Sequence, residues 1–203
     1  NFRNLNDKII TTILATQPDQ LHIGTYGKGL YLCKRGEDTA SRMVLPKSKG
    51  SRFISFLEYN TNNKELWIGT FGGLIRLSAV KATLYTNNPL NPESLVDNKT
   101  QTATFDRFGS LWIGTINGLS RFDQRLKLFN LYREFKWQDT LLNNNVYCIY
   151  EDPKQNLWLG TISSGILKFD PQTETLTAWP LIKTLGVETR SIRAIMCDHN
   201  GQM

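Results

Sequence analysis

Apolar and polar residues alternate along most of this chain. The alternating runs are short, and clusters of Gly, Pro, Asn and Asp separate them. A period of two predicts β-strands, because successive side chains of a strand point to opposite faces of the sheet. We find no stretch with the 3.6-residue period of an amphipathic helix. The pattern therefore predicts an all-β chain of short strands joined by turns.

One motif within this pattern occurs four times. It reads Leu-Trp-Ile-Gly-Thr with small changes, and its glycines recur at intervals of 45, 45 and 46 residues. The copies begin at Leu21, Leu66, Leu111 and Leu157. One alternating run precedes each copy, and two more follow it. Four short antiparallel strands in about 45 residues are typical of one blade of a β-propeller, which is the fold class that we expect.

The spacing of the motif predicts the domain organisation. Four complete blade repeats are expected at residues 5–50, 51–95, 96–141 and 142–187. Residues 188–203 are expected to hold the opening strand of the next blade, because Ser191–Asp198 matches Asn145–Asp152. We therefore interpret the chain as a segment of a larger, seven-bladed propeller, whose remaining blades are expected partners.

The aligned tryptophans and glycines are expected to be structural. Because a blade buries its faces only against its neighbours, large mid-strand side chains are expected to pack between blades, and glycines suit the close approach of a neighbouring strand. These blade-core residues are Trp67, Trp112, Trp158, Gly24, Gly69, Gly114 and Gly160. The alternative is that the tryptophans form a sugar-stacking platform, but three equivalent copies suit a core better.

The repeats resemble the two-component regulator propeller repeat. Leu141–Asp152 is similar to the opening of that repeat, with its Asn-Asn-x-Val and Glu-Asp residues, and Leu157–Asp170 is similar to its middle. The chain departs from the pattern at His22, which stands in place of Trp, at Thr100, which replaces an apolar residue, and at Tyr59-Asn60, which replaces Glu-Asp.

This resemblance implies a setting for the chain. Such repeats form the periplasmic sensor region of Bacteroidetes hybrid two-component histidine kinase/response regulators, which are inner-membrane proteins. A β-sandwich, a membrane helix, a histidine kinase, a receiver and a DNA-binding domain are then expected outside this chain. The resemblance further implies a non-catalytic segment that binds or positions a glycan-derived oligosaccharide, adjacent sensor domains as partners, and a homodimer of the full sensor.

The charge of the chain affects which ligand is expected. There are 24 Lys and Arg against 18 Asp and Glu, a net charge of +6. The densest basic stretch contains Lys34, Arg35, Arg42, Lys47, Lys49 and Arg52. A basic patch of this kind favours an acidic oligosaccharide over a neutral one, although it is also what a solvated edge of a larger assembly looks like. We expect no direct contact with nucleic acid, because no aromatic-plus-basic binding motif is present.

Candidate ligand residues lie on turns. In the usual blade order, the turn between the second and third strands shares a face with the connection into the next blade. Aromatic rings there could cover the apolar face of a sugar while polar groups bind hydroxyls or carboxylates. The candidates are Tyr26, Lys28, Arg52, Phe71, Asn117, Arg133, Lys136, Trp137 and Arg190. The alternative is that these are ordinary loop residues or contacts to an adjacent domain.

Other functional classes are less favoured. The sequence lacks a Gly-x-Ser-x-Gly elbow, a His-Glu-x-x-His motif and a phosphate-binding loop, and adjacent carboxylates such as Glu151-Asp152 point to opposite faces of a strand. Asp152 is expected to be a turn acceptor. A streptogramin-lyase-like enzyme would need a catalytic His and a metal, yet the two histidines, His22 and His199, are expected at opposite faces. We expect no catalytic residue, metal or cofactor, and a protein-binding scaffold is the main alternative function.

Overall fold

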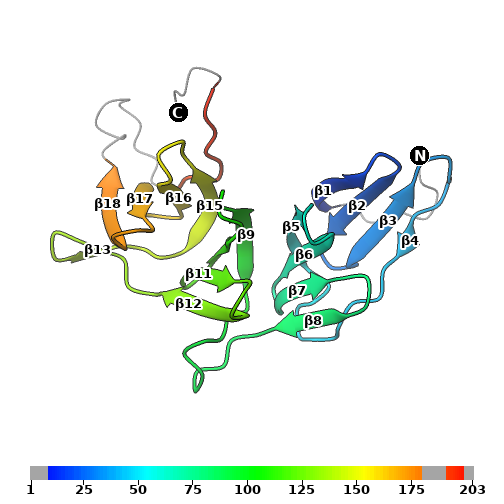
Figure 1. The fold of residues 1–203 in the computed structure, drawn as a ribbon, viewed down its shortest axis with the longest axis horizontal. Coiled ribbons are helices and arrows are strands. Elements are labelled where there is room, and N and C mark those ends of the chain that lie inside the picture. Colours follow the sequence, from blue (N-terminus) through cyan, green and yellow to red (C-terminus); the bar gives the residue numbers. More distant parts are fainter. Residues whose placement is uncertain (1–8, 180–190, 199–203) are drawn as a thin grey trace. The chain divides into compact units, whose positions relative to one another are not determined.

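The computed structural model describes residues 9–179 and 191–198. These residues form eighteen β-strands, and four antiparallel sheets contain all but two of them (Figure 1). The chain divides into two compact units. Within the described ranges, no helix is long and apolar enough to cross a membrane.

The first unit comprises the described residues 9–87 and 98–100. Its first sheet contains β1 (Ile10–Gln17), β2 (Gln20–Thr25), β3 (Leu30–Lys34) and β4 (Ser41–Arg42). Its second sheet contains β5 (Ile54–Asn60), β6 (Glu65–Thr70), β7 (Gly73–Leu77) and β8 (Ala82–Tyr85). In both sheets each strand pairs only with its neighbours in the chain, so each sheet is a four-stranded antiparallel meander.

The second unit comprises residues 88–97, 101–179 and 191–198. One sheet contains β9 (Thr100–Phe105, with Thr100 in the first unit), β10 (Leu111–Thr115), β11 (Gly118–Asp123) and β12 (Leu128–Tyr132). The other contains β15 (Val146–Glu151), β16 (Leu157–Thr161), β17 (Ile166–Asp170) and β18 (Thr175–Trp179). These sheets are meanders too.

Strand alternation places the core of each unit between its two sheets. In the first unit Leu30 of β3 packs in one cluster with Leu66 and Ile68 of β6. In the second unit Trp112 of β10 packs in one cluster with Leu157 and Leu159 of β16. Leu66 and Ile68 of β6 therefore pack against the preceding sheet, as Leu157 and Leu159 of β16 do, while Trp112 of β10 packs against the sheet that follows it. The motif is apolar on both sides because both sides are covered.

Neighbouring sheets leave no room for a side chain at the motif glycine. A Cβ atom on Gly24 would lie 2.6 Å from Cγ2 of Ile54, the first residue of β5. One on Gly114 would lie 2.8 Å from Cγ1 of Val146, the first residue of β15. Both distances are shorter than carbon atoms tolerate. Gly24 and Gly114 thus leave room for the first strand of the following sheet to approach.

The motif threonine closes the turn after the second strand. In each blade its hydroxyl donates to the carbonyl of the glycine near the end of the turn, over 2.7–2.9 Å. The hydroxyl oxygen also accepts a backbone amide from within the turn. These fully buried residues are Thr25, Thr70, Thr115 and Thr161. A side chain that hydrogen-bonds to its own turn stabilises a compact connection between two strands.

The three motif tryptophans are buried, with exposed fractions of 0%, 0% and 5% for Trp67, Trp112 and Trp158. Trp112 forms an edge-to-face contact with Phe169 of β17, over 5.7 Å between ring centroids. The other two tryptophans contact rings of their own sheets: Trp67 stacks on Tyr85, and Trp158 forms an edge-to-face contact with Trp179. A Lys or Arg from the third strand lies over each indole, 5.4–5.8 Å from its centroid.

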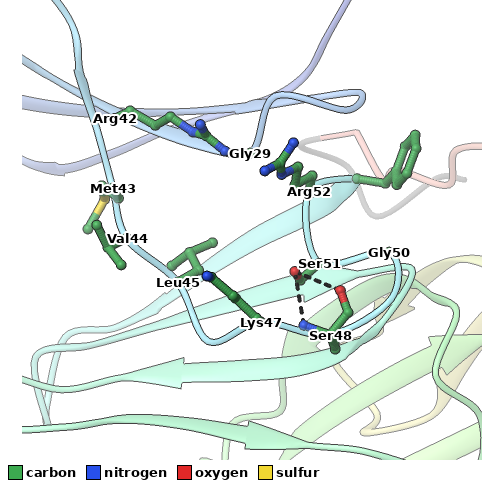
Figure 2. Close-up of a pocket in the computed structure, with 11 residues that line it drawn as sticks. Gly29, Arg42, Met43, Val44, Leu45, Lys47, Ser48, Gly50, Ser51 and Arg52 are labelled. Carbon is green, nitrogen blue, oxygen red and sulfur yellow. Dashed lines mark hydrogen bonds between the residues drawn. The ribbon is translucent and has the colours of Figure 1, made fainter.

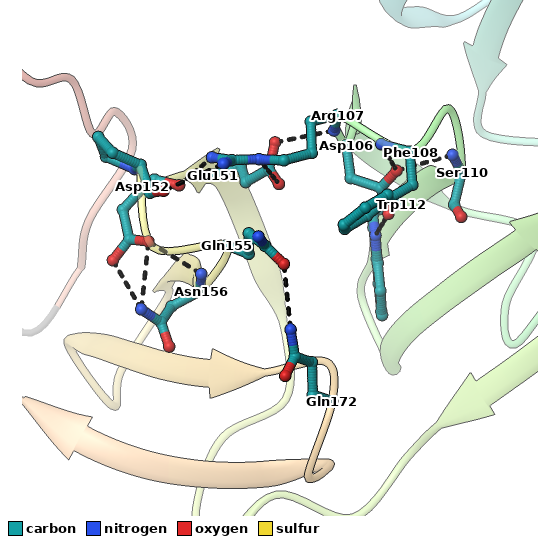
Figure 3. A network of polar contacts seen from close by, with 11 residues as sticks. Asp106, Arg107, Phe108, Ser110, Trp112, Glu151, Asp152, Gln155, Asn156 and Gln172 are labelled. Atoms are coloured by element: carbon teal, nitrogen blue, oxygen red, sulfur yellow. Dashed lines mark hydrogen bonds and ion pairs between the residues drawn. The ribbon is translucent and has the colours of Figure 1, made fainter.

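An aspartate joins the first turn of each blade in the second unit to its tryptophan, and Figure 3 shows this for Asp106 and Trp112. Oδ1 of Asp106 accepts the amides of Phe108 and Ser110, and Oδ2 accepts the indole N–H of Trp112 over 2.9 Å. Asp152 accepts the amide of Asn156 and the indole N–H of Trp158 in the same way. The prediction that Asp152 is a turn acceptor is confirmed, whereas its bond to the indole was not predicted.

Arg107 links the two sheets of the second unit. Its guanidinium pairs with Oε1 of Glu151 over 3.2 Å and donates to the carbonyls of Asp152 and Pro153 (Figure 3). Its backbone amide donates to Oε2 of the same Glu151. Arg107 therefore binds a carboxylate and two carbonyl groups at the first turn of the following sheet. These bonds add a polar link between the two sheets to their apolar contacts.

The three departures from the repeat pattern have local explanations. Thr100 is fully buried, but its hydroxyl donates to the carbonyl of Thr70 over 2.9 Å. Oδ1 of Asn60 accepts the amides of Asn62 and Asn63, which is the turn role that Asp has in other blades. His22 is 6% exposed, and burial lowers its pKa, so the neutral ring fits the position of the tryptophan.

Two segments differ from simple expectation. The connection after β12 contains a two-stranded hairpin, β13 (Lys136–Trp137) and β14 (Thr140–Leu141), whose loop residues Gln138 and Asp139 have φ angles of 46° and 59°. Such turns usually use Asn or Gly, so the sequence carried no hairpin signal. Residues 191–198 form no strand, although the amide of Ile192 donates to the carbonyl of Thr161. A strand needs a paired neighbour, and no further strand of that blade lies in the described ranges.

Candidate ligand site

Three aromatic rings meet where the two sheets of the first unit adjoin. Tyr26 follows β2, Phe71 follows β6, and Phe53 lies just before β5. The Tyr26 ring contacts Phe53 edge-to-face at 4.9 Å between centroids, and Phe53 stacks on Phe71 at 5.7 Å. Tyr26 remains 48% exposed. Two predicted candidates, Tyr26 and Phe71, are thus brought together by a third ring that the prediction did not include.

The loop that joins the two sheets, residues 47–53, has a defined shape. Ser51 donates from its hydroxyl to the carbonyl of Ser48, and the Ser48 hydroxyl donates to the carbonyl of Gly72 over 2.8 Å. Gly50 has a φ of 95°, and a Cβ there would lie 2.8 Å from the carbonyl carbon of Phe71. Only glycine fits both the conformation and the space. The loop is therefore held against the turn that carries Phe71.

Arg52 is fixed at the end of this loop by its backbone. Its carbonyl accepts the amides of Gly27 and Gly29, over 3.1 and 3.0 Å. These two glycines belong to the turn between β2 and β3. The predicted candidates Arg52 and Tyr26 are consequently held at the same place in the first unit, on a connection and a turn that lie far apart in the sequence.

A pocket of about 510 Å³ opens beside this loop (Figure 2). Three of its lining residues, Arg42, Lys47 and Arg52, carry positive charge, and none carries negative charge. The other lining residues are apolar or small: Gly29, Met43, Val44, Leu45, Ser48, Gly50, Ser51 and Phe53. The aromatic cluster adjoins the pocket through Phe53, which belongs to both.

The three cations of the pocket make no ion pair with the described residues. In contrast, three other arginines of the described residues pair with carboxylates: Arg76 with Glu65, Arg107 with Glu151 and Arg125 with Asp123. The hydrogen bond to Glu65 is also the chief cause of the raised pKa of Arg76. A concave surface with positive charge and no internal counter-ion attracts anions.

The remaining candidates lie elsewhere. Lys28 is exposed on the turn that carries Tyr26. In the second unit, Asn117 donates to Oδ2 of Asp97 over 2.7 Å, and Lys136 pairs with Glu134 over 2.7 Å. Trp137, in the β13–β14 hairpin, is 36% exposed.

Arg133 borders a different, open pocket. That pocket also contains Glu93, Glu134 and Glu174, so its charge is mixed. Arg190 lies outside the described residues. The first unit therefore brings Tyr26, Arg52 and Phe71 together, while the candidates of the second unit have polar partners or acidic surroundings.

The prediction missed Arg42 and Phe53 as candidate ligand residues. Arg42 ends β4, an outer strand of only two residues, and Phe53 precedes β5. Arg42 and Lys47 had been noted only as part of the basic stretch. The available signal was their position on both sides of the connection between two repeats, since that connection returns the chain to the face that carries the turns.

Metal and thiol chemistry find no support in the described part of the chain. No group of three or more His, Cys, Asp and Glu residues there could hold a metal ion. Cys33, Cys148 and Cys197 are free. Burial raises the pKa of Cys148 and of Cys33, which keeps these thiols protonated at neutral pH.

The fold and this site define a class of protein. Each of the four sheets is a four-stranded antiparallel meander, and in both units the motif glycine of the first sheet packs against the first strand of the second sheet. Most of the candidate ligand residues lie on turns and connections, whereas Arg42 ends β4 and Lys136 and Trp137 form the short strand β13 within a connection. These are features of β-propeller repeat proteins, whose binding residues lie on loops.

Comparison with known proteins specifies the repeat. Residues 140–163 match the family model of the two component regulator propeller. The chain is also 30% identical, over 179 residues, to Histidine kinase P4 of Formosa agariphila, a match that covers 80% of this chain and 13% of that protein. The resemblance predicted from the sequence is confirmed for residues 140–163, which match this repeat.

Solved structures confirm the fold class. The extracellular domain of the putative hybrid two component system BT4673 from B. thetaiotaomicron superposes with a TM-score of 0.72 at 19% identity, covering 95% of this chain and 28% of that one. The corresponding domain of BT3049 from the same organism gives a TM-score of 0.58 at 20% identity, covering 85% and 30%. The chain is all-β and built of four-stranded propeller blades. It spans less than a third of each of these proteins.

Proposed function

We propose that this chain is a non-catalytic ligand-sensing segment of a hybrid two-component sensor, and that it binds a glycan-derived oligosaccharide. The observation that carries the proposal is the pocket of the first unit, which combines three cations without a carboxylate and an adjoining cluster of three aromatic rings. Aromatic rings next to hydrogen-bonding groups are what a carbohydrate site needs. The lack of any acidic lining residue favours an acidic oligosaccharide.

The proposal includes a place in the cell and a set of partners. By analogy with the extracellular domains that it resembles, the segment would lie in the periplasmic part of an inner-membrane protein. Kinase activity would reside in other domains of that protein, as the name of the Formosa agariphila relative suggests. A homodimer of the full sensor would transmit the signal if the ligand binds one arrangement of the dimer more tightly than another.

Calorimetry of the whole sensor region tests this function. The protein is titrated with size-defined neutral, uronate-containing and sulfated oligosaccharides at low and high salt. We expect binding to an acidic oligosaccharide that weakens as salt rises, because exposed charge pairs are screened.

Other outcomes have definite meanings. Salt-insensitive binding to a neutral oligosaccharide would support the sensor function and show that the basic residues do not contribute to binding. The absence of binding to every oligosaccharide would contradict the proposal and favour a protein-binding scaffold instead.

A further inference from the structure

We propose that Arg42 and Arg52 form a clamp for an anionic group on a sugar ring, either a sulfate ester or a carboxylate, with Gly29 as the floor between them. This inference rests on the proposed function, because it specifies which part of an oligosaccharide the pocket recognises. Sulfate and carboxylate share the chemistry that matters here, which is a compact group of negatively charged oxygens.

The two arginines reach the pocket from different elements. Arg42 is the last residue of β4, and Nε and Nη2 of its guanidinium would both lie 3.9 Å from a Cβ atom on Gly29. Arg52 ends the connection from the other side, and its carbonyl accepts the amide of Gly29. In Figure 2 both guanidinium groups point toward the Gly29 backbone. Because Gly29 has no side chain, a ligand can reach the space in front of it.

Two positive groups that face one pocket repel each other unless an anion lies between them. Here no lining carboxylate provides that anion, and the described residues offer neither arginine an ion-pair partner. The guanidinium fork matches the oxygens of carboxylate and sulfate groups in a two-pronged geometry. An anionic sugar substituent would supply the missing charge.

The backbone holds this geometry before any ligand arrives. The Arg52 carbonyl accepts hydrogen bonds from the amides of Gly27 and Gly29, and these bonds fix the backbone of Arg52. The amide of Met43 donates to the carbonyl of Leu30 over 2.9 Å, which fixes the residue next to Arg42. A site whose backbone is already ordered loses less entropy on binding than a flexible loop.

The rest of the pocket suits a sugar ring. Val44 is 93% exposed and lines the pocket next to Met43 and Leu45, so an apolar surface lies beside the clamp. The apolar face of a pyranose could rest there, and a neighbouring sugar could contact the exposed ring of Tyr26. Lys47, on the same rim, could bind a second anionic group.

The clamp is tested with three variants of the whole sensor region: Arg42→Gln, Arg52→Gln and the double variant. Lys49→Gln is the matched control, because Lys49 is an exposed cation of the same loop that does not line the pocket. Each protein is titrated with a sulfated, a uronate-containing and a neutral oligosaccharide of equal length. We expect each arginine variant to lose about tenfold in affinity for the anionic ligand, while Lys49→Gln loses less than threefold. The anionic oligosaccharide that binds more tightly, sulfated or uronate-containing, identifies the anionic group that the clamp recognises.

A second probe separates this inference from the proposed function. Inorganic sulfate and chloride are compared at equal ionic strength by thermal unfolding of the wild-type and double-variant proteins. Stabilisation by sulfate of the wild type alone would support the clamp even if no oligosaccharide bound, in which case only the proposed function fails. Anionic oligosaccharides that bind all variants equally would overturn the clamp and leave the sensor intact. Failure of both probes would overturn both.

Discussion

The indole nitrogen of Trp112 donates a 2.9 Å hydrogen bond to Oδ2 of Asp106, six residues earlier in the chain. The same distance joins Trp158 to Asp152 in the next blade. One carboxylate therefore satisfies a buried indole with one oxygen and the amides of a tight turn with the other. The turn between the first two strands is thereby tied to the core of the blade.

Replacing this carboxylate by an amide is expected to destabilise the protein. In Asp106→Asn, one oxygen becomes an N–H₂ group, so that either the turn amides or the indole lose their acceptor. An unsatisfied buried donor costs about 1–3 kcal/mol, and the urea midpoint of the sensor region should fall accordingly. Asp38→Asn, which changes an exposed carboxylate in the connection after β3, is the control and should leave the midpoint unchanged. Equal midpoints for both variants would contradict the structural role.

The contact between Gly114 and Val146 predicts coupling between adjacent blades. A Cβ atom at position 114 would lie 2.8 Å from Cγ1 of Val146, so Gly114→Ala is expected to destabilise by about 1–3 kcal/mol through overpacking. Cγ2 of Thr102 would lie as close, at 2.7 Å, so Val146→Ala removes only part of the clash. The double variant should be less destabilised than the sum by up to about 1 kcal/mol. Combining Gly114→Ala with Val80→Ala, an exposed site, should be additive. Additivity in both pairs would show that the blades do not press on each other here.

Gly50 offers a test of loop shape with a close control. Gly50 and Gly36 have similar φ angles, 95° and 85°, but a Cβ at Gly36 meets nothing within 4 Å whereas one at Gly50 meets the Phe71 backbone. Both alanine variants lose about 1 kcal/mol through backbone strain. Only Gly50→Ala should also displace Arg52 and weaken binding of an anionic oligosaccharide, measured by calorimetry. Equal affinities of the two variants for the oligosaccharide would show that the shape of the loop does not affect ligand binding.

Glu58 on β5 predicts a pH dependence of stability. Desolvation raises its pKa to about 7, so the folded protein holds a proton that the unfolded chain releases near pH 4.5. Stability is then greatest below the unfolded pKa and falls as pH rises toward 7, by about 3 kcal/mol at most. Glu58→Gln removes this titration, so its urea midpoint should change less than that of the wild type between pH 5 and pH 8. Parallel curves for the two proteins would show that Glu58 titrates normally.

Much of the fold could be predicted from the sequence because the repeat carries the information several times over. The interval of the Gly-Thr pairs defined the blades, and the alternation around each pair defined the strands. The hairpin of residues 136–141 escaped prediction because Gln138 and Asp139 adopt left-handed conformations without the usual Asn or Gly. The aspartate–indole bond escaped too, since two residues six apart show no local pattern.

The candidate site could be predicted only in part. Tyr26, Arg52 and Phe71 were recognised as residues of turns and connections, and their role in binding remains a prediction. Phe53 and Arg42 were missed as candidates because both lie just outside the turns and the connection of residues 47–52 that were considered, although both line the pocket. Their importance depends on which residues face the same space, and spacing along the chain does not record that.

The sequence by itself determined the blade as a unit, because alternation and turn residues act over neighbouring positions and the repeat confirms each assignment. Only the tertiary structure decided where the first unit gathers its charge. Arg42 and Arg52 enter one pocket because Leu30 and Ile54 pack in the core between two sheets and because the Arg52 carbonyl binds the turn at Gly27 and Gly29. Those contacts join residues from different strands and connections, so they exist only once the two blades have packed together.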